Sequence, residues 1–146
     1  MYNNSVERSR FAESFLFISA MGRAQDIYKL ESGGAPAFTF DELGIDVPPR
    51  TVQASVAGGL VHVAGGGLRG PLFDYVIDTV NNSFWYGTIA VVRNAGKYNA
   101  CGFVYSNGTV YCVQPTGSTL PFCVNQYGGT KIQTNNAGWD IYSIKN

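Results

Sequence analysis

Hydrophobic and polar positions follow two different periods along this chain. Over residues 1–32, a stretch without proline, apolar side chains recur every three or four positions, which predicts one long helix. An advance of about 100° per residue places one set of apolar residues on a single stripe: Ala12, Leu16, Ala20, Ala24 and Ile27. Phe11, Phe15 and Ile18 fall on almost the opposite side. A helix on one sheet buries a single face, so we expect the first set to form the helix–sheet core and the second to await a subunit partner.

Residues 33–71 read as a loop that connects the helix to a sheet. The Ser32-Gly33-Gly34 step suits the left-handed cap that ends many helices. Alternation over residues 51–63 is weak and predicts strand only poorly, and the three glycines of residues 65–67 predict a flexible loop.

Strict alternation begins at Leu72. Four apolar segments within residues 72–113 are separated by turn residues, and Asn107-Gly108 is a strong hairpin signal. They predict a four-stranded antiparallel meander. Residues 114–146 form a loop region and a tail, whose last apolar cluster is expected to dock on the sheet rim: Trp139, Ile141, Tyr142 and Ile144. The predicted fold is α+β, a long N-terminal helix packed on this sheet in one domain over residues 1–146.

Composition narrows the class of protein. The chain has 146 residues, enough for one domain with a real core, and is 45% hydrophobic but only 14% charged. Ten basic and ten acidic residues cancel, so no global field attracts nucleic acid or anionic lipid. No apolar run approaches the roughly 18 residues that span a bilayer, and no signal peptide precedes the helix.

Three cysteines make an odd count. Cys101, Cys112 and Cys123 have no paired spacing typical of a zinc site. We favour a disulfide between Cys112 and Cys123, because these two residues bracket a turn-rich loop that a bridge would hold. Such a bridge contributes on the order of 2–3 kcal/mol and implies an oxidising compartment. Cys101 is left without a partner.

Three segments resemble the type IV pilins and the related pseudopilins of type II secretion. They are Val6-Glu7-Arg8-Ser9-Arg10-Phe11-Ala12-Glu13, Ala24-Gln25-Asp26-Ile27-Tyr28 and Phe40-Asp41-Glu42-Leu43-Gly44-Ile45-Asp46-Val47-Pro48. Cys112 with Cys123, followed by Gly128-Gly129, looks like the C-terminal disulfide region of that family. The sequence departs from the family in lacking a prepilin leader, a methylated Phe and an apolar half-helix ahead of Tyr2, and we expect this chain to be the soluble domain of such a subunit.

The resemblance implies a pilin-like fold and a structural role. The chain would polymerise with like or related subunits through its helix, handled by a pilus or secretion assembly machinery. The inner membrane would hold the precursor through the missing segment, and the assembled subunit would lie in an extracellular fimbrium, at the cell surface or in the periplasm. On its own, we expect a monomer or a weak associator. The alternative is a minor pilin at the fibre tip that binds surfaces or DNA.

Candidate chemistry is sparse, and we expect no enzymatic activity, no cofactor and no metal site. Asp41, Glu42 and Asp46 offer oxygens for calcium, but their spacing fits turn caps better. His62 has no acid or nucleophile nearby in sequence. Asp74 and Asp78 are expected to face solvent from one strand. Six aromatic residues offer a stacking surface for sugars or bases, although cross-strand packing is the commoner explanation: Trp85, Tyr86, Tyr98, Tyr105, Tyr111 and Tyr127.

Overall fold

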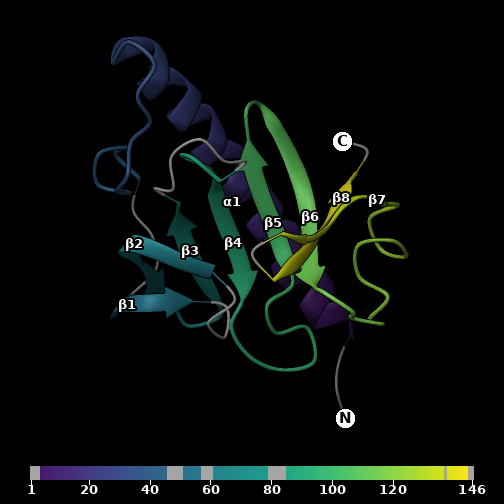
Figure 1. Ribbon diagram of the computed structural model, residues 1–146. Helices are drawn as coiled ribbons and strands as arrows, with labels where there is room; N and C mark the ends of the chain where they lie inside the picture. Colours follow the sequence, from purple (N-terminus) through teal and green to yellow (C-terminus); the bar gives the residue numbers. More distant parts are fainter. Residues whose placement is uncertain (1–3, 46–50, 57–60, 79–84, 137, 145–146) are drawn as a thin grey trace.

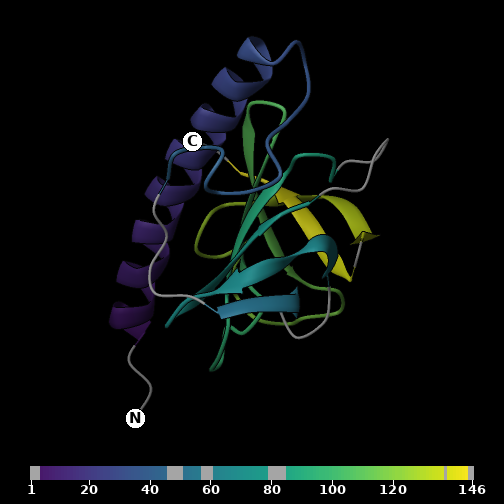
Figure 2. The ribbon, with the colours of Figure 1, turned by 90° about the vertical axis from the view of Figure 1, so that its left-hand side faces the viewer.

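The computed structural model describes residues 4–45, 51–56, 61–78, 85–136 and 138–144, with residues 51–56 and 61–67 described by their backbone alone. One helix, α1 (Asn4–Glu31), lies along one face of an antiparallel sheet (Figures 1 and 2). The strands are β1 (Thr51–Val56), β2 (Val61–Arg69), β3 (Phe73–Ile77), β4 (Ile89–Arg93), β5 (Gly102–Ser106), β6 (Thr109–Pro115), β7 (Thr130–Asn136) and β8 (Trp139–Ser143).

The predicted helix and the four predicted strands are present. The helix ends where expected: Gly33 has φ 81°, and the Gly34 N–H donates to the Lys29 carbonyl at 2.7 Å, which satisfies a carbonyl of the last turn. Strands β3, β4, β5 and β6 pair in chain order. Asn107 (φ 48°) and Gly108 (φ 89°) take the left-handed conformation that a two-residue hairpin between β5 and β6 requires.

The extent of the sheet is the main correction. The sheet has eight strands in the order β1-β2-β3-β4-β5-β6-β8-β7, so the expected four-stranded meander is wrong. The three glycines at residues 65–67 lie inside β2 rather than in a loop. The tail pairs with β6 along its backbone, from Tyr111–Ser143 to Pro115–Trp139, instead of docking on the rim. β2 contains three glycines and β7 is mostly polar, so neither strand carries a regular alternation of apolar residues. β8 does carry the apolar residues Trp139, Ile141 and Tyr142, but its position beside β6 depends on pairing within the sheet.

Both faces of the central strands are buried. Residues that alternate along β4 and β5 divide between two cores. Ile89, Val91 and Phe103 face α1, whereas Ala90 and Val104 belong to a second core on the opposite face, with Trp85 and Trp139. Figure 2 shows β7 and β8, in yellow, on the side of the sheet away from α1. Trp85 Nε1 donates to Asn136 Oδ1 of β7 at 2.7 Å, which ties that edge to the second core.

Candidate subunit interface

Two opposite sides of the helix each carry large apolar side chains together with polar ones, and the sheet covers one of these sides. We call the covered set the inner seam, spaced alternately four and three residues apart: Glu7, Phe11, Ser14, Ile18, Met21 and Gln25. All six side chains are buried. Their spacing keeps them on one side of a helix, where they meet β4 and β5. Because three of the six residues are polar, the pattern of apolar residues in the sequence does not reveal this seam.

An ion pair holds the N-terminal part of the inner seam. Arg93 Nε of β4 donates to both carboxylate oxygens of Glu7, at 3.1 and 3.2 Å, and Arg93 Nη1 donates to the Leu72 carbonyl at 2.8 Å. Both charged side chains are almost fully buried. A buried charge is tolerated when a partner and hydrogen bonds replace water, so this pair fixes where the helix meets the sheet.

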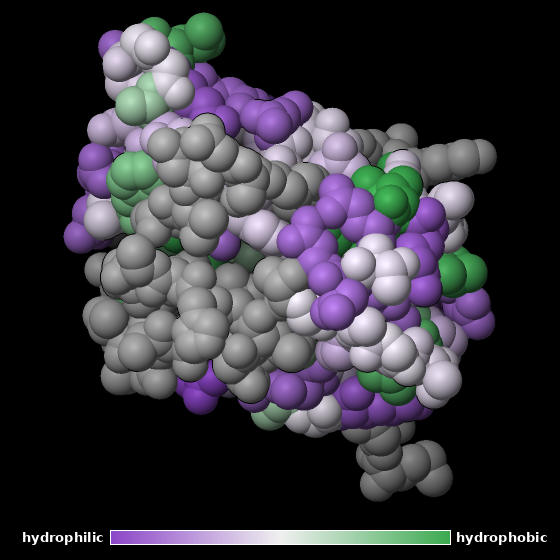
Figure 3. All heavy atoms as spheres, viewed as in Figure 1, coloured by the Kyte–Doolittle hydropathy of each residue, from purple (hydrophilic) through white to green (hydrophobic). Residues whose placement is uncertain are grey.

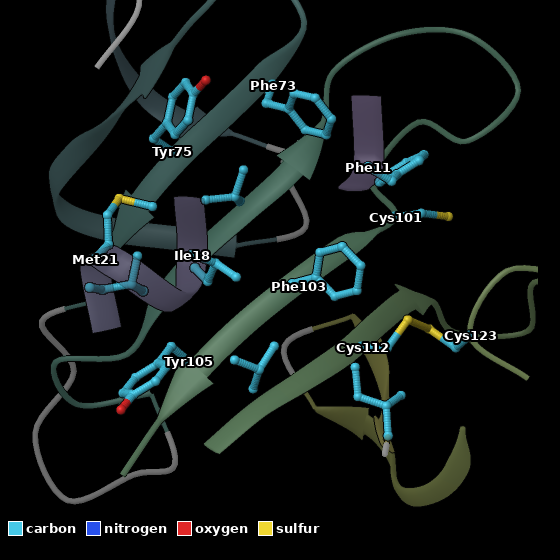
Figure 4. Close-up of a cluster of buried hydrophobic side chains, with 14 of the residues drawn as sticks. Phe11, Ile18, Met21, Phe73, Tyr75, Cys101, Phe103, Tyr105, Cys112 and Cys123 are labelled. Atoms are coloured by element: carbon cyan, nitrogen blue, oxygen red, sulfur yellow. A yellow bond between two sulfur atoms is a disulfide. The ribbon is translucent and has the colours of Figure 1, made fainter. Parts of the chain in front are cut away.

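Aromatic rings hold the next turn. The Phe11 ring lies 4.5 Å from that of Phe122, centroid to centroid. It lies 5.5 Å from that of Phe73 (Figure 4). Phe15 is half-buried, with its ring edge-on to Phe103 at 5.2 Å. Ile18 is fully buried in the same core. These three residues pack in the core between α1 and the sheet, so their expected role as free interface residues is wrong.

Polar contacts fasten the C-terminal half. Gln25 accepts from the Ala37 N–H at 2.8 Å and donates to the carbonyls of Ala37 and Gly87 at 2.9 and 3.0 Å. Tyr105 donates to Asp26 Oδ2, and its ring packs so closely on Gly22 that a Cβ there would lie 2.1 Å from the ring. Gln25 thereby holds both the chain after the helix and the turn before β4 to α1, while Tyr105 joins α1 to β5.

The opposite side of α1 faces solvent. We call this set the outer seam, spaced as the inner seam is: Ser9, Glu13, Leu16, Ala20, Arg23, Ile27 and Leu30. All seven residues are exposed, and Leu16, Ile27 and Leu30 are 71%, 55% and 84% exposed. In Figure 2 this side of the helix lies away from the sheet, and Figure 3 shows apolar atoms at the C-terminal end of α1.

The predicted helix–sheet core is therefore wrong. Of its five members, Ala12, Leu16, Ala20 and Ile27 are exposed and Ala24 is only half-buried. The helix does carry apolar residues on two faces, as the sequence predicts. The face expected to lie on the sheet is exposed, and the face expected to contact a partner is the one that the sheet covers. The sheet selects the face with the larger aromatic and branched side chains, because these fill more of the space above β4 and β5 and their polar companions find partners there.

The predicted disulfide joins Cys112 to Cys123, with sulfurs 2.09 Å apart and Cα atoms 5.7 Å apart. The Cys123 N–H donates to Gln114 Oε1 at 3.0 Å, so the bridge and one buried amide hold the same loop on β6. Cys101 is a free cysteine, buried in the same hydrophobic core as Cys112 and Cys123 (Figure 4). Burial raises the pKa of its thiol to about 12, which leaves no thiolate for chemistry near neutral pH.

The acidic candidates have structural partners. Glu42 accepts from the Tyr28 hydroxyl at 2.9 Å, the Phe38 N–H at 3.3 Å and the Thr39 hydroxyl at 3.1 Å, and these bonds lower its pKa. It caps the turn after the helix, as its spacing indicates, whereas Asp46 lies outside the described residues.

Asp74 and Asp78 do not face solvent as expected. Both are buried, and Asp74 accepts from Arg69 through both oxygens at 3.0 Å. Asp74 lies beside the β2 strand that the sequence did not clearly predict, and Arg69 of that strand neutralises its charge.

The aromatic candidates lie mainly inside the molecule. Trp85, Tyr98 and Tyr105 are buried, and Tyr86, Tyr111 and Tyr127 are half-buried. Their rings are therefore not displayed as an open stacking surface. His62 lies in β2, in register with Ser55 of β1.

Within the described ranges, no three His, Cys, Asp or Glu side chains gather where they would hold a metal ion. No helix in the same ranges is long and apolar enough to cross a membrane. Comparison of the chain with protein-family models, with curated proteins and with solved structures finds no match.

Proposed function

We propose that this chain is a structural subunit of a type IV pilus or a related pseudopilus, and that it polymerises through the outer seam of α1. The observation that carries this proposal is the exposure of Leu16, Ile27 and Leu30 along one side of a helix whose other side is fully engaged. Exposed large apolar side chains scattered singly need no explanation, whereas these three share one side of a helix and could be covered together by a neighbouring helix.

The helix is suited to transmit contacts along a fibre. The buried ion pair of Glu7 with Arg93, the ring cluster of Phe11 and the hydrogen bonds of Gln25 fasten it to the sheet at three levels. Because the helix is fixed on the sheet, the outer seam has one fixed geometry. Little conformational entropy is therefore lost when a neighbour binds.

The outer seam alone contributes too little free energy to drive assembly by a clear margin. Burial of each large side chain between subunits contributes roughly 1.5–3 kcal/mol, whereas association costs an estimated 4–15 kcal/mol. Three such side chains leave assembly marginal. The proposal therefore requires a further contact, and an apolar helical segment ahead of α1, as the pilin resemblance implies, would supply it.

The test is incorporation into fibres. An apolar helix of about 20 residues fused ahead of residue 2 is produced in a bacterium that has a pilus assembly machinery, and sheared fibres are probed for the chain. We expect the chain along the fibre shaft, and Ile27→Glu should remove it. Ile132→Glu is the matched control, since Ile132 on β7 is 47% exposed and lies outside α1.

Two outcomes would contradict the proposal: absence of the folded chain from fibres, or equal incorporation of the Ile27→Glu and Ile132→Glu variants. Detection only in trace amounts at fibre tips would contradict a role in the shaft and favour the minor tip subunit.

A further inference from the structure

Exposed apolar side chains are concentrated on one side of α1. Among the described residues seven large hydrophobic side chains are exposed, and four belong to this helix: Val6, Leu16, Ile27 and Leu30. The last three occupy the outer seam, and Val6 continues it by one step toward the N-terminus. The alternating spacing of three and four residues is that of the contact positions of a coiled coil, so the partner that fits this surface is another helix.

The outer seam is complementary to itself when it is reversed. Residues whose numbers sum to 36 face each other when a second copy of α1 is laid antiparallel on the first. In this register Leu16 meets Ala20, a large side chain against a small one, and Glu13 meets Arg23, opposite charges. Val6 meets Leu30 and Ser9 meets Ile27. Each pairing occurs twice, because the arrangement has a two-fold axis.

The alternative registers match less well. A shift of one heptad, to a sum of 43, places Glu13 on Leu30 and Arg23 on Ala20, which would desolvate both charges against apolar groups. A parallel pair in register places Glu13 on Glu13 and Arg23 on Arg23. The sum of 36 also overlaps the two helices from residue 6 to residue 30, nearly the whole of α1.

We infer that two copies of this chain associate through their outer seams as an antiparallel, two-fold helix pair, with Glu13 of each copy against Arg23 of the other. The pair has four layers, in the order sheet, helix, helix, sheet, because each outer seam faces away from its own sheet (Figure 2). The interface is isologous and closes at two copies.

This inference goes beyond the proposed function, since pairing requires no fibre. If both hold, pairing covers the surface that a fibre would use. The dimer would then have to dissociate before the chain joins a fibre through this surface.

Sedimentation equilibrium of the intact chain tests the pair. We expect a monomer–dimer equilibrium between about 10 μM and about 1 mM, a range typical of weak association, with no larger species. Glu13→Arg alone and Arg23→Glu alone should each raise the Kd about tenfold or more, because like charges then meet twice. The double variant Glu13→Arg/Arg23→Glu should restore the Kd to within about threefold.

Arg8→Glu is the control, since Arg8 is exposed on α1 but lies off the outer seam, and it should leave the Kd unchanged. All substituted residues are on the surface, and matching thermal melts confirm that each variant folds. A chain that stays monomeric at every concentration, a double variant no tighter than the singles, or species larger than a dimer would each overturn the antiparallel pair. A fibre that incorporates the chain while no dimer forms would overturn the pair and leave the proposed function standing.

Discussion

Glu7 of α1 and Arg93 of β4 form a buried ion pair, 86 residues apart in sequence, with Arg93 Nε 3.1 Å from Glu7 Oε1. Removal of one partner leaves the other charge buried without compensation, which typically costs 3–5 kcal/mol. We expect Glu7→Ala to lower the free energy of unfolding by about that amount, measured by urea denaturation.

Glu13→Ala is the matched control for this prediction, because Glu13 lies on the exposed side of the same helix, and its effect should stay within about 0.5 kcal/mol. Equal effects of the two substitutions would show that the ion pair does not hold α1 to the sheet. A double replacement of Glu7 and Arg93 by apolar residues should recover much of the loss.

Ile18 of the inner seam and Leu16 of the outer seam are only two positions apart, but truncation of each should change the free energy of unfolding by very different amounts. Ile18→Ala should destabilise the fold by about 2–5 kcal/mol, because Ile18 is fully buried and its removal leaves a cavity. Leu16→Ala removes a side chain that is 71% exposed, and its effect should stay within about 0.5 kcal/mol. Denaturation midpoints of the two variants decide between this assignment of faces and the reverse one.

The raised pKa of Tyr105 leads us to expect that the folded state loses stability at alkaline pH. Burial, together with the hydrogen bond to Asp26, raises its pKa to about 12 from the usual value near 10. The unfolded state therefore loses this proton first, so the contribution of Tyr105 is present below about pH 10 and is lost as the pH rises toward 12. We expect the slope of stability against pH in this window to be smaller in Tyr105→Phe, and an unchanged slope would contradict the assignment.

We expect the number of cysteines that an alkylating reagent modifies to depend on unfolding and reduction, and intact mass measures this number. The native chain should react at no cysteine, because Cys101 is buried with a pKa raised to about 12 and the other two form a disulfide. Unfolding without reductant should expose one thiol, and unfolding with reductant three. Three modified thiols without reduction would contradict the disulfide.

The local elements of this protein are readable from its sequence. Periodicity over residues 1–32 predicts α1, Gly33 and Gly34 mark its end, and alternation with the Asn107-Gly108 turn predicts β3 to β6. The turn-rich loop between Cys112 and Cys123 favours their pairing, which the structure confirms. Each of these signals acts within a few residues, through backbone conformation or side-chain spacing.

Only the tertiary structure decides which face of α1 is buried and how far the sheet extends. Three of the six inner-seam residues are polar, and Glu7 and Gln25 are satisfied by Arg93, Ala37 and Gly87, partners that local sequence does not reveal. Strands β1, β2 and β7 join the sheet through main-chain hydrogen bonds with neighbours, which leave little mark on side-chain pattern. The apolar residues of β8 are visible in the sequence, but their pairing with β6 is not. The sequence by itself determines that α1 has two seams. The shape and hydrogen-bonding groups of the sheet determine which seam remains outside, because a buried polar group is stable only where its partner lies.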